Sequence, residues 1–184
     1  MYASAHNRIS VENYLAGEKD AELRHEYVHG YVYAMAGSSP AHSIIKVNIA
    51  AALGNALAES EAVVYASDMK VRADEANFYY PDVMIVCDND LTSYFQENPC
   101  VIVEVMSKST ARKDLHEKLY SYSGIESLQL YLLIDSQIRQ VHGHYRTKNG
   151  WEERSFSSEE TIPVPCADTE LSHAQIYAKT ELAL

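Results

Sequence analysis

Cysteine is scarce in this sequence, with three residues among 184, at positions 87, 100 and 166. An odd number at wide spacings matches no disulfide framework, and the chain has no C-x-x-C pair of the kind that binds zinc. Cys87 and Cys100 lie in apolar runs, so we interpret both as small core residues. The cysteines therefore support neither a disulfide-rich scaffold nor a zinc-binding module.

Long apolar runs are also lacking. No segment approaches the run of about 18 apolar residues that a membrane helix requires, and the N-terminus has no basic region followed by an apolar stretch. The composition, 47% hydrophobic and 22% charged, is that of an ordinary globular protein, and no low-complexity linker divides the chain. We expect one domain over residues 1–184, cytoplasmic and without a membrane partner.

Positive charge is in short supply. The chain has 15 Lys and Arg against 26 Asp and Glu, a formal net charge of −11. This balance counts against a general nucleic-acid coat, because affinity for phosphate backbones depends on Lys and Arg. A metal-dependent nuclease stays compatible with it, since such an enzyme needs only a local basic patch. The candidate for such a patch is a group of four basic residues within eleven positions: Lys108, Arg112, Lys113 and Lys118. Acidic residues are interleaved with them, which also fits a solvated helix face.

The spacing of apolar residues predicts both helices and strands. A first helix begins at the cap residue Ser10 and ends at Gly17, and a later one ends at Gly124. Aromatic and β-branched residues alternate on either side of His29-Gly30, which indicates a hairpin. The remaining strands are expected over residues 62–74, 78–87, 100–106, 128–135 and 138–146. Residues 151–165 are expected to form another strand and a turn-rich tail, and residues 171–179 a short closing helix.

The longest predicted helix covers residues 40–60, where Pro40 is acceptable in the first turn. Its apolar residues recur at a spacing of three to four, which predicts that one side faces the core. These residues are Ile44, Val47, Ala51, Leu53 and Leu57.

Two acidic residues occur at the positions of apolar strands. "YYPDVMIVC" places Asp82 directly after Pro81, and "CVIVEVMSKST" places Glu104 inside an apolar run. Neighbouring strands present side chains on one face at every second residue, so both carboxylates can point to one spot. Because two buried carboxylates would repel each other, a divalent cation between them explains the pattern, and Mg²⁺ prefers such oxygen ligands. The alternative is that Asp82 only begins a strand and Glu104 pairs with a Lys or Arg.

The order of these residues resembles a known nuclease superfamily. Pro81-Asp82, then Glu104 at a strand end, then a helix is similar to the PD-(D/E)XK nucleases, in which the acidic pair binds Mg²⁺ and a lysine follows two residues later. More specifically, four stretches over residues 26–135 resemble successive blocks of the Uma-two family of restriction endonucleases. They are "EYVHGYVYAMAGSSPAH", "YYPDVMIVC", "VIVEVMSKSTARKDLHEKLYSY" and "LQLYLLID".

The resemblance implies an α/β, restriction-endonuclease-like fold, with a central mixed β-sheet flanked by helices. It also implies Mg²⁺, replaceable by Mn²⁺, bound by Asp82, Glu104 and the carbonyl of Val105. Met106 stands where the superfamily has its lysine, so the family's lysine is matched instead by Lys118 on the following helix. The alternative for Lys118 is a surface pair with Asp114.

Three auxiliary residues complete the site implied by the resemblance: Glu26, His42 and Tyr122. Tyr122 lies four residues after Lys118, so the two share one side of a helix. Glu26 matches an early acidic residue of the family and His42 a position near the start of the long helix. The alternatives are an exposed hairpin acid for Glu26 and a structural helix-terminal histidine for His42.

The function that follows from the resemblance is a metal-dependent endonuclease that hydrolyses phosphodiester bonds of nucleic acid, with DNA as the expected substrate. A homodimer is expected from the superfamily, because cutting two strands needs two sites. The alternative is a catalytically inactive interaction or oligomerisation module of the same fold, which the net acidity and the lack of a recognisable DNA-reading segment favour.

Overall fold

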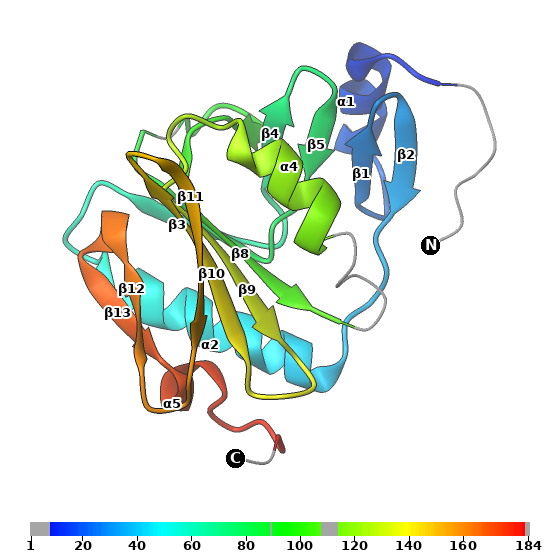
Figure 1. Cartoon of the computed structure of the whole chain (residues 1–184). Helices are drawn as coiled ribbons and strands as arrows, with labels where there is room; N and C mark the ends of the chain where they lie inside the picture. The colour runs from blue at the N-terminus through cyan, green and yellow to red at the C-terminus, as the bar shows by residue number, and fades with distance from the viewer. Residues whose placement is uncertain (1–7, 89, 108–113, 183–184) are drawn as a thin grey trace.

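A six-stranded mixed sheet forms the centre of the structure (Figure 1). In this computed structural model, residues 8–88, 90–107 and 114–182 are described. The strand order is β11-β10-β9-β8-β6-β3, with β8 and β9 parallel and the other neighbours antiparallel. The strands are β3 (Val63–Ala66), β6 (Val83–Val86), β8 (Pro99–Met106), β9 (Leu130–Asp135), β10 (Val141–Thr147) and β11 (Gly150–Phe156).

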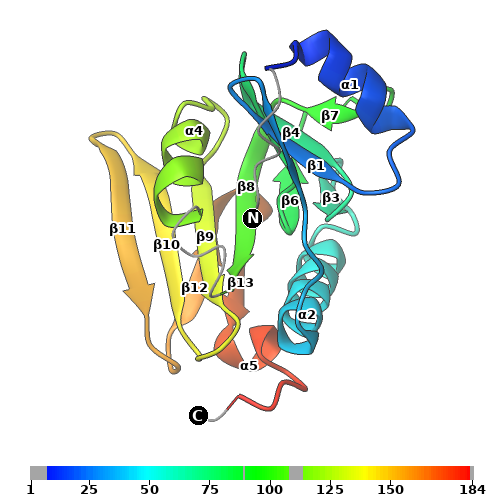
Figure 2. The same cartoon turned by 90° about the vertical axis from the view of Figure 1, so that its right-hand side faces the viewer.

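Helices cover both faces of this sheet. The long helix α2 (Pro40–Ala56) lies on one face, and α4 (Leu119–Ser123), preceded by the π-helical turn η1 (Asp114–Lys118), lies on the other (Figure 2). Every residue of β8 is buried, because the strand is covered on both sides. Its side chains alternate, with Val103 and Val105 in the core on the α2 side and Ile102 and Met106 in the core on the α4 side. This alternation directs Glu104 toward α4.

A second, five-stranded sheet lies beside the first, in the order β2-β1-β5-β4-β7. The predicted hairpin is confirmed: β1 pairs antiparallel with β2, and His29 and Gly30 at the turn have positive φ, 49° and 92°. The N-terminal helix α1 (Val11–Lys19) is capped by Ser10, as predicted, but continues past Gly17. The strands are β1 (His25–Val28), β2 (Tyr31–Ala34), β4 (Lys70–Asp74), β5 (Asn77–Tyr79) and β7 (Phe95–Gln96).

Two predicted strands are each divided between the two sheets. Residues 62–74 form β3 and β4, separated at Ser67, which has a left-handed φ of 62°. Residues 78–87 form the end of β5 and then β6, because Pro81 has no amide hydrogen and the ladder of β5 stops before it. The break places Asp82 where the chain passes from one sheet into the other.

The long helix forms where predicted but ends at Ala56 instead of near residue 60. Leu53 and Leu57 of the predicted apolar side are buried, whereas the rest of the buried side differs. The buried residues are Ile45, Ile49 and Leu53, at a spacing of four, and Val47 is 60% exposed. The predicted set of apolar residues mixed two neighbouring stripes of the helix, because isoleucine and alanine occur on both. His42, three residues before Ile45, lies on the same side of the helix and contacts Asp82 just before the start of β6.

The C-terminal part packs on the α2 side of the central sheet. It consists of the hairpin β12 (Thr161–Val164) and β13 (Thr169–Ser172), joined by the 3₁₀ turn η2 (Pro165–Ala167), and the helix α5 (His173–Ile176). Ile162, Leu171 and Ile176 belong to the same core cluster as the buried side of α2. The hairpin thereby covers apolar surface that the central sheet would otherwise expose.

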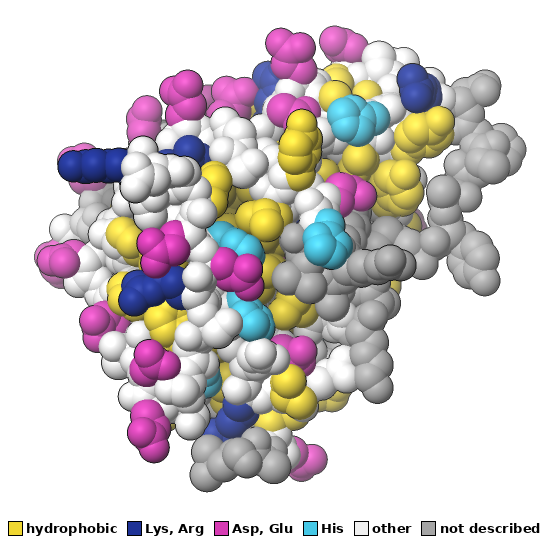
Figure 3. All heavy atoms as spheres, in the orientation of Figure 1, with side chains coloured by type: hydrophobic (Ala, Val, Ile, Leu, Met, Phe, Trp, Pro, Cys, Tyr) yellow, Lys and Arg dark blue, Asp and Glu magenta, His cyan; other side chains and the backbone are white. Residues whose placement is uncertain are grey.

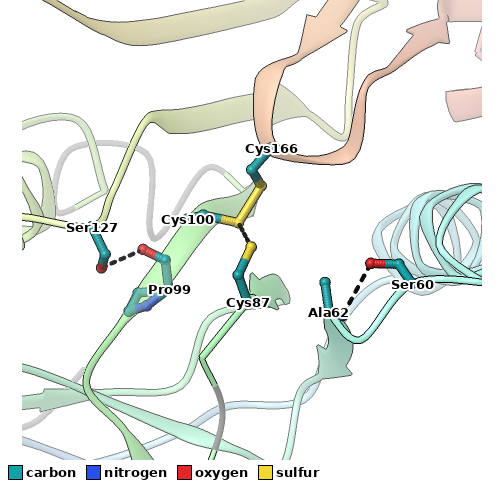
Figure 4. Close-up of a disulfide and its surroundings, with 7 residues drawn as sticks. All are labelled: Ser60, Ala62, Cys87, Pro99, Cys100, Ser127 and Cys166. Carbon is teal, nitrogen blue, oxygen red and sulfur yellow. Dashed lines mark hydrogen bonds between the residues drawn. A yellow bond between two sulfur atoms is a disulfide. The ribbon is translucent and has the colours of Figure 1, made fainter.

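The interpretation of the cysteines needs correction. Cys100 and Cys166 form a disulfide between β8 and η2, and Cys87 is an exposed free thiol (Figure 4). The two bonded residues are 66 positions apart. Their proximity depends on the C-terminal hairpin folding back against β8, which spacing in the sequence does not reveal.

Among the charged side chains visible on one face, acidic ones are more widespread than basic ones (Figure 3). Figure 3 shows Asp and Glu spread over this face, with Lys and Arg in a few separate places. The described residues on this face thus form no broad basic patch, in agreement with the net charge of −11. Within the described ranges of the chain, no helix combines the length and apolar character needed to cross a membrane.

Candidate active site

A buried ion cluster joins the two sheets to the π-helical turn η1. Lys118, at the end of η1, places its Nζ 2.8 Å from Oε1 of Glu104 on β8 and 3.0 Å from Oε1 of Glu26 on β1. All three residues are at most 5% exposed. A buried charge is tolerated only when it is paired, so the ammonium and the two carboxylates depend on one another. The lysine predicted from the helix therefore reaches the predicted acidic residue of β8.

Tyrosines surround this cluster. The hydroxyl of Tyr122 donates to Oε1 of Glu104 at 3.1 Å, and burial, reinforced by the charge of Glu104, raises the pKa of Tyr122 well above its usual value. The hydroxyl therefore stays protonated and acts as a donor. The ring of Tyr79 lies 5.6 Å from Nζ of Lys118, within cation–π range. Together the two rings shield the ion cluster from solvent.

Asp82 occupies the end of the ladder between β6 and β8. The last pair in register is Val83 with Val103, and the amide of Val105, two residues farther along β8, donates to Oδ2 of Asp82 at 2.8 Å. The carboxylate thus replaces the backbone acceptor that the ended strand no longer provides. It is also more open than its neighbours, with 16% of the side chain exposed.

His42 approaches Asp82 from the opposite face of the sheet. It lies in the first turn of α2, where Ser39 caps the helix, and its Nε2 is 3.2 Å from Oδ2 of Asp82. Its Nδ1 is buried, and no hydrogen-bond partner for it occurs among the described residues. His42 therefore contacts Asp82 through one ring nitrogen, and its other ring nitrogen is a buried polar atom whose partner is not among the described residues.

The structure brings the sequence candidates together as two adjoining groups. Glu26, Tyr122 and Lys118 gather around Glu104, and His42 contacts Asp82, with the groups joined through the consecutive residues Glu104 and Val105. Val105 contacts Asp82 through its amide, so its carbonyl as a metal ligand stays a prediction. Of the predicted basic patch, only Lys118 is described; Lys108, Arg112 and Lys113 lie outside the described residues.

The surroundings of Met106 agree with the loss of the superfamily's lysine at that position. Met106 is 6% exposed and belongs to the apolar cluster on the α4 side, together with Tyr122 and Tyr131. A methionine fills this apolar space, and the positive charge enters instead from η1. The alternative of a surface pair between Lys118 and Asp114 is wrong, because Lys118 is buried against two other acids.

Tyr79 is a site residue that the sequence reasoning missed. Besides its contact with Lys118, its hydroxyl lies 3.2 Å from Oγ of Ser121 and donates to Glu117 at 3.4 Å. The available signal was its place in "YYPD", three residues before Asp82, on a short strand that leads into the site.

The donor chemistry of the site fits a hard divalent cation. Three carboxylates and one ammonium, those of Glu26, Asp82, Glu104 and Lys118, leave a net charge of −2 (1 − 3) in a largely buried place, with His42 counted as neutral. Carboxylate oxygens are the ligands that Mg²⁺ prefers. The side chains do not converge closely, however: among the described residues, three cysteines form the only group of three ligand atoms within 4.8 Å of one another.

Comparisons with known proteins identify the family of the chain. Residues 11–175 match the Uma2 (Uma-two) family, described as "Putative restriction endonuclease". Two uncharacterized proteins of Synechocystis are similar: slr1290 is 33% identical over 78% of this chain and 77% of its own length, and sll1609 is 31% identical over 75% and 80%.

A solved structure shares the fold. It is described as a "putative nuclease belonging to DUF820" from Anabaena variabilis, and it superposes with a TM-score of 0.77 at 15% identity, over 92% of this chain and 97% of its own. This similarity confirms the expected nuclease-like α/β architecture. The family itself follows from the match over residues 11–175: the chain belongs to the Uma2 family.

Proposed function

We propose that this protein is a metal-dependent endonuclease that hydrolyses phosphodiester bonds of nucleic acid, with DNA as the substrate. The observation that carries the proposal is the buried pairing of Lys118 with Glu26 and Glu104, directly beside Asp82. A cluster of this kind is costly to maintain for stability alone, because burying charges offsets much of the attraction between them. The family description supports the same activity.

Asp82 and Glu104 would hold a divalent cation, Mg²⁺ or Mn²⁺, with the Val105 carbonyl as a further oxygen ligand. Such an ion supplies Lewis-acid chemistry, lowering the pKa of a bound water and neutralising charge on phosphate. Asp82 is the more open of the two carboxylates, so we place the side of the site that meets the substrate there. The hydrogen bond from Tyr122 and the ion pair with Lys118 fix the orientation of Glu104.

Lys118 would act as a fixed positive charge. Its Nζ is anchored by Glu104 and Glu26, so the ammonium is positioned before substrate arrives and needs little rearrangement. In this role it binds a non-bridging oxygen of the scissile phosphate or orients the attacking water through an N–H. Glu26 holds the ammonium from the second sheet, and His42 holds Asp82 from α2.

Cleavage assays on the purified protein test the proposal. Supercoiled plasmid, linear duplex and single-stranded DNA, and RNA would each be incubated with Mg²⁺, with Mn²⁺ and with EDTA. We expect DNA cleavage with either metal and none with EDTA. If no nucleic acid is cut while the metal binds, the result favours the inactive interaction module, and cleavage of RNA alone would contradict the choice of DNA. Two-strand cutting at matched positions would support the predicted homodimer.

Replacing Glu104 with glutamine is expected to weaken Mn²⁺ binding at least tenfold, or about 1.4 kcal/mol. Lys118 keeps its partner Glu26 in this variant, so the fold should be retained. Isothermal titration with Mn²⁺ measures the affinity, and Glu152→Gln, an exposed acid on β11, is the matched control. Equal affinity in wild type and Glu104→Gln would remove Glu104 from the metal site.

A further inference from the structure

The three cysteines converge from three separate elements. Cys87 directly follows β6, Cys100 is the second residue of β8, and Cys166 lies in the turn η2 between β12 and β13. Their sulfur atoms all lie within 4.8 Å of one another. The chain contains three cysteines in total, so its complete set of thiols meets at one place.

The three sulfurs are not equivalent. Cys100 is bonded to Cys166, and the free Sγ of Cys87 is in contact with Sγ of Cys100, at 3.1 Å. Figure 4 shows the sulfur of Cys100 between the other two. Cys87 is exposed, whereas Cys100 is only 3% exposed. An accessible thiol thus lies in contact with a buried sulfur of a disulfide, which places a candidate attacking group within reach of the bond.

We propose that Cys87, Cys100 and Cys166 form a thiol–disulfide exchange site, at which one disulfide moves between the pairings Cys100–Cys166 and Cys87–Cys100. The Cys87 thiol loses its proton to solvent, and the thiolate attacks Sγ of Cys100. A bond forms between Cys87 and Cys100 as the bond between Cys100 and Cys166 breaks, and Cys166 leaves as a thiolate that takes up a proton. The exchange consumes neither oxidant nor reductant.

The structure favours exchange over a metal site at the same place. A thiophilic cation such as Zn²⁺ binds thiolates, and two of the three sulfurs are already bonded to each other. Cys100 is in contact with both other sulfurs, so either pairing can form with a small movement of its partner. Binding of Zn²⁺ by the reduced protein is therefore an outcome that would count against the proposal.

Exchange changes which parts of the fold are covalently joined. The Cys100–Cys166 bond joins the C-terminal hairpin to β8 across 66 positions, whereas Cys87–Cys100 would join the neighbouring strands β6 and β8 across 13. Glu104 lies on β8, and Asp82 directly precedes β6. Cys87 and Cys100 lie at the other end of this strand pair, away from the two acids. The new pairing would link the two strands at the end away from the candidate site and leave the hairpin held by noncovalent contacts, which are apolar packing and the hydrogen bond from Tyr145 to Pro163.

Disulfide mapping of the intact protein tests the proposal. The oxidised protein would be incubated at pH 8 without added thiol, quenched in acid and blocked with N-ethylmaleimide. Trypsin does not separate Cys87 from Cys100, because no Lys or Arg lies between Arg72 and Lys108. A glutamate-specific protease at acidic pH cuts at Glu97 and resolves the two cysteines.

We expect both linked peptides in the wild type, with the maleimide divided between Cys87 and Cys166. Cys87→Ser should contain only the Cys100–Cys166 link and no labelled Cys166, whereas Cys166→Ser, treated with glutathione disulfide, should form Cys87–Cys100. The proposal is overturned if, at every incubation time, the wild type carries the maleimide label on Cys87 alone. This measurement on the wild type tests the proposal even if Cys166→Ser does not fold. The proposal is also overturned if the reduced protein retains one Zn²⁺ that protects all three thiols from alkylation. Neither readout depends on nuclease activity.

Discussion

Replacing Lys118 with methionine is expected to lower the free energy of unfolding by about 3–5 kcal/mol. Its ammonium lies 2.8 Å from Glu104 and 3.0 Å from Glu26, and removing it takes away the positive charge that both buried carboxylates contact, so their mutual repulsion increases. Methionine has nearly the same length, so the loss reports the charge rather than a cavity. Urea denaturation at neutral pH measures the change.

Two matched variants separate charge from packing. Lys118→Arg keeps the positive charge and should recover most of the lost stability. Glu26→Gln and Glu104→Gln, introduced together with Lys118→Met, remove all three charges and should also raise the unfolding midpoint above that of Lys118→Met alone. A Lys118→Met protein as stable as wild type would show that the cluster is not needed for the fold.

The same substitution is expected to lower DNA cleavage at least a hundredfold, about 3 kcal/mol of barrier. The assay must be run well below the unfolding temperature of the variant, so that loss of fold does not mimic loss of chemistry. Adding Met106→Lys returns a positive charge to the same face of β8, two residues after Glu104. Partial recovery of cleavage would show that both positions serve one site, and wild-type cleavage by Lys118→Met would remove the lysine from catalysis.

The secondary structure nearest the site was largely predictable. The runs around Asp82 and Glu104 are so apolar that only buried strands accommodate them, and a hairpin at His29-Gly30 follows from its flanking alternation. These elements fix where Glu26 and Glu104 lie along the chain. That Lys118, Glu104 and Glu26 belong to one site was expected only from the family resemblance. No local sequence pattern relates residues on β1, β8 and η1.

The parts that were not predictable depend on tertiary contacts. Residues 62–74 have a uniform strand pattern, and the break at Ser67 is needed only because its two halves belong to different sheets. The same holds for the disulfide of Cys100 with Cys166, which requires the C-terminal hairpin to pack against the central sheet. In α2, which of two adjacent apolar stripes is buried depends on how the helix packs against the sheet, and Ile45 and Ile49 are the residues that it buries.

Asp82→Asn is expected to lower metal-dependent cleavage about a thousandfold, about 4 kcal/mol of barrier. Asparagine keeps the shape of the side chain but removes the negative charge that would hold the cation. Its amide oxygen still accepts the hydrogen bond from Val105, so the free energy of unfolding should change by no more than about 1 kcal/mol. The variant therefore separates the chemistry of the site from the integrity of the fold.

Asp88→Asn is the matched control, since Asp88 is an exposed acid just past the other end of β6. It should cleave like wild type, whereas Asp82→Asn should lose both cleavage and the Mn²⁺ affinity measured by titration. If Asp82→Asn cuts DNA at the wild-type rate, Asp82 serves only to satisfy the Val105 amide at the end of the ladder. A loss of cleavage with unchanged Mn²⁺ affinity would instead place the cation on Glu104 and Glu26 and assign Asp82, with His42 beside it, to the attacking water.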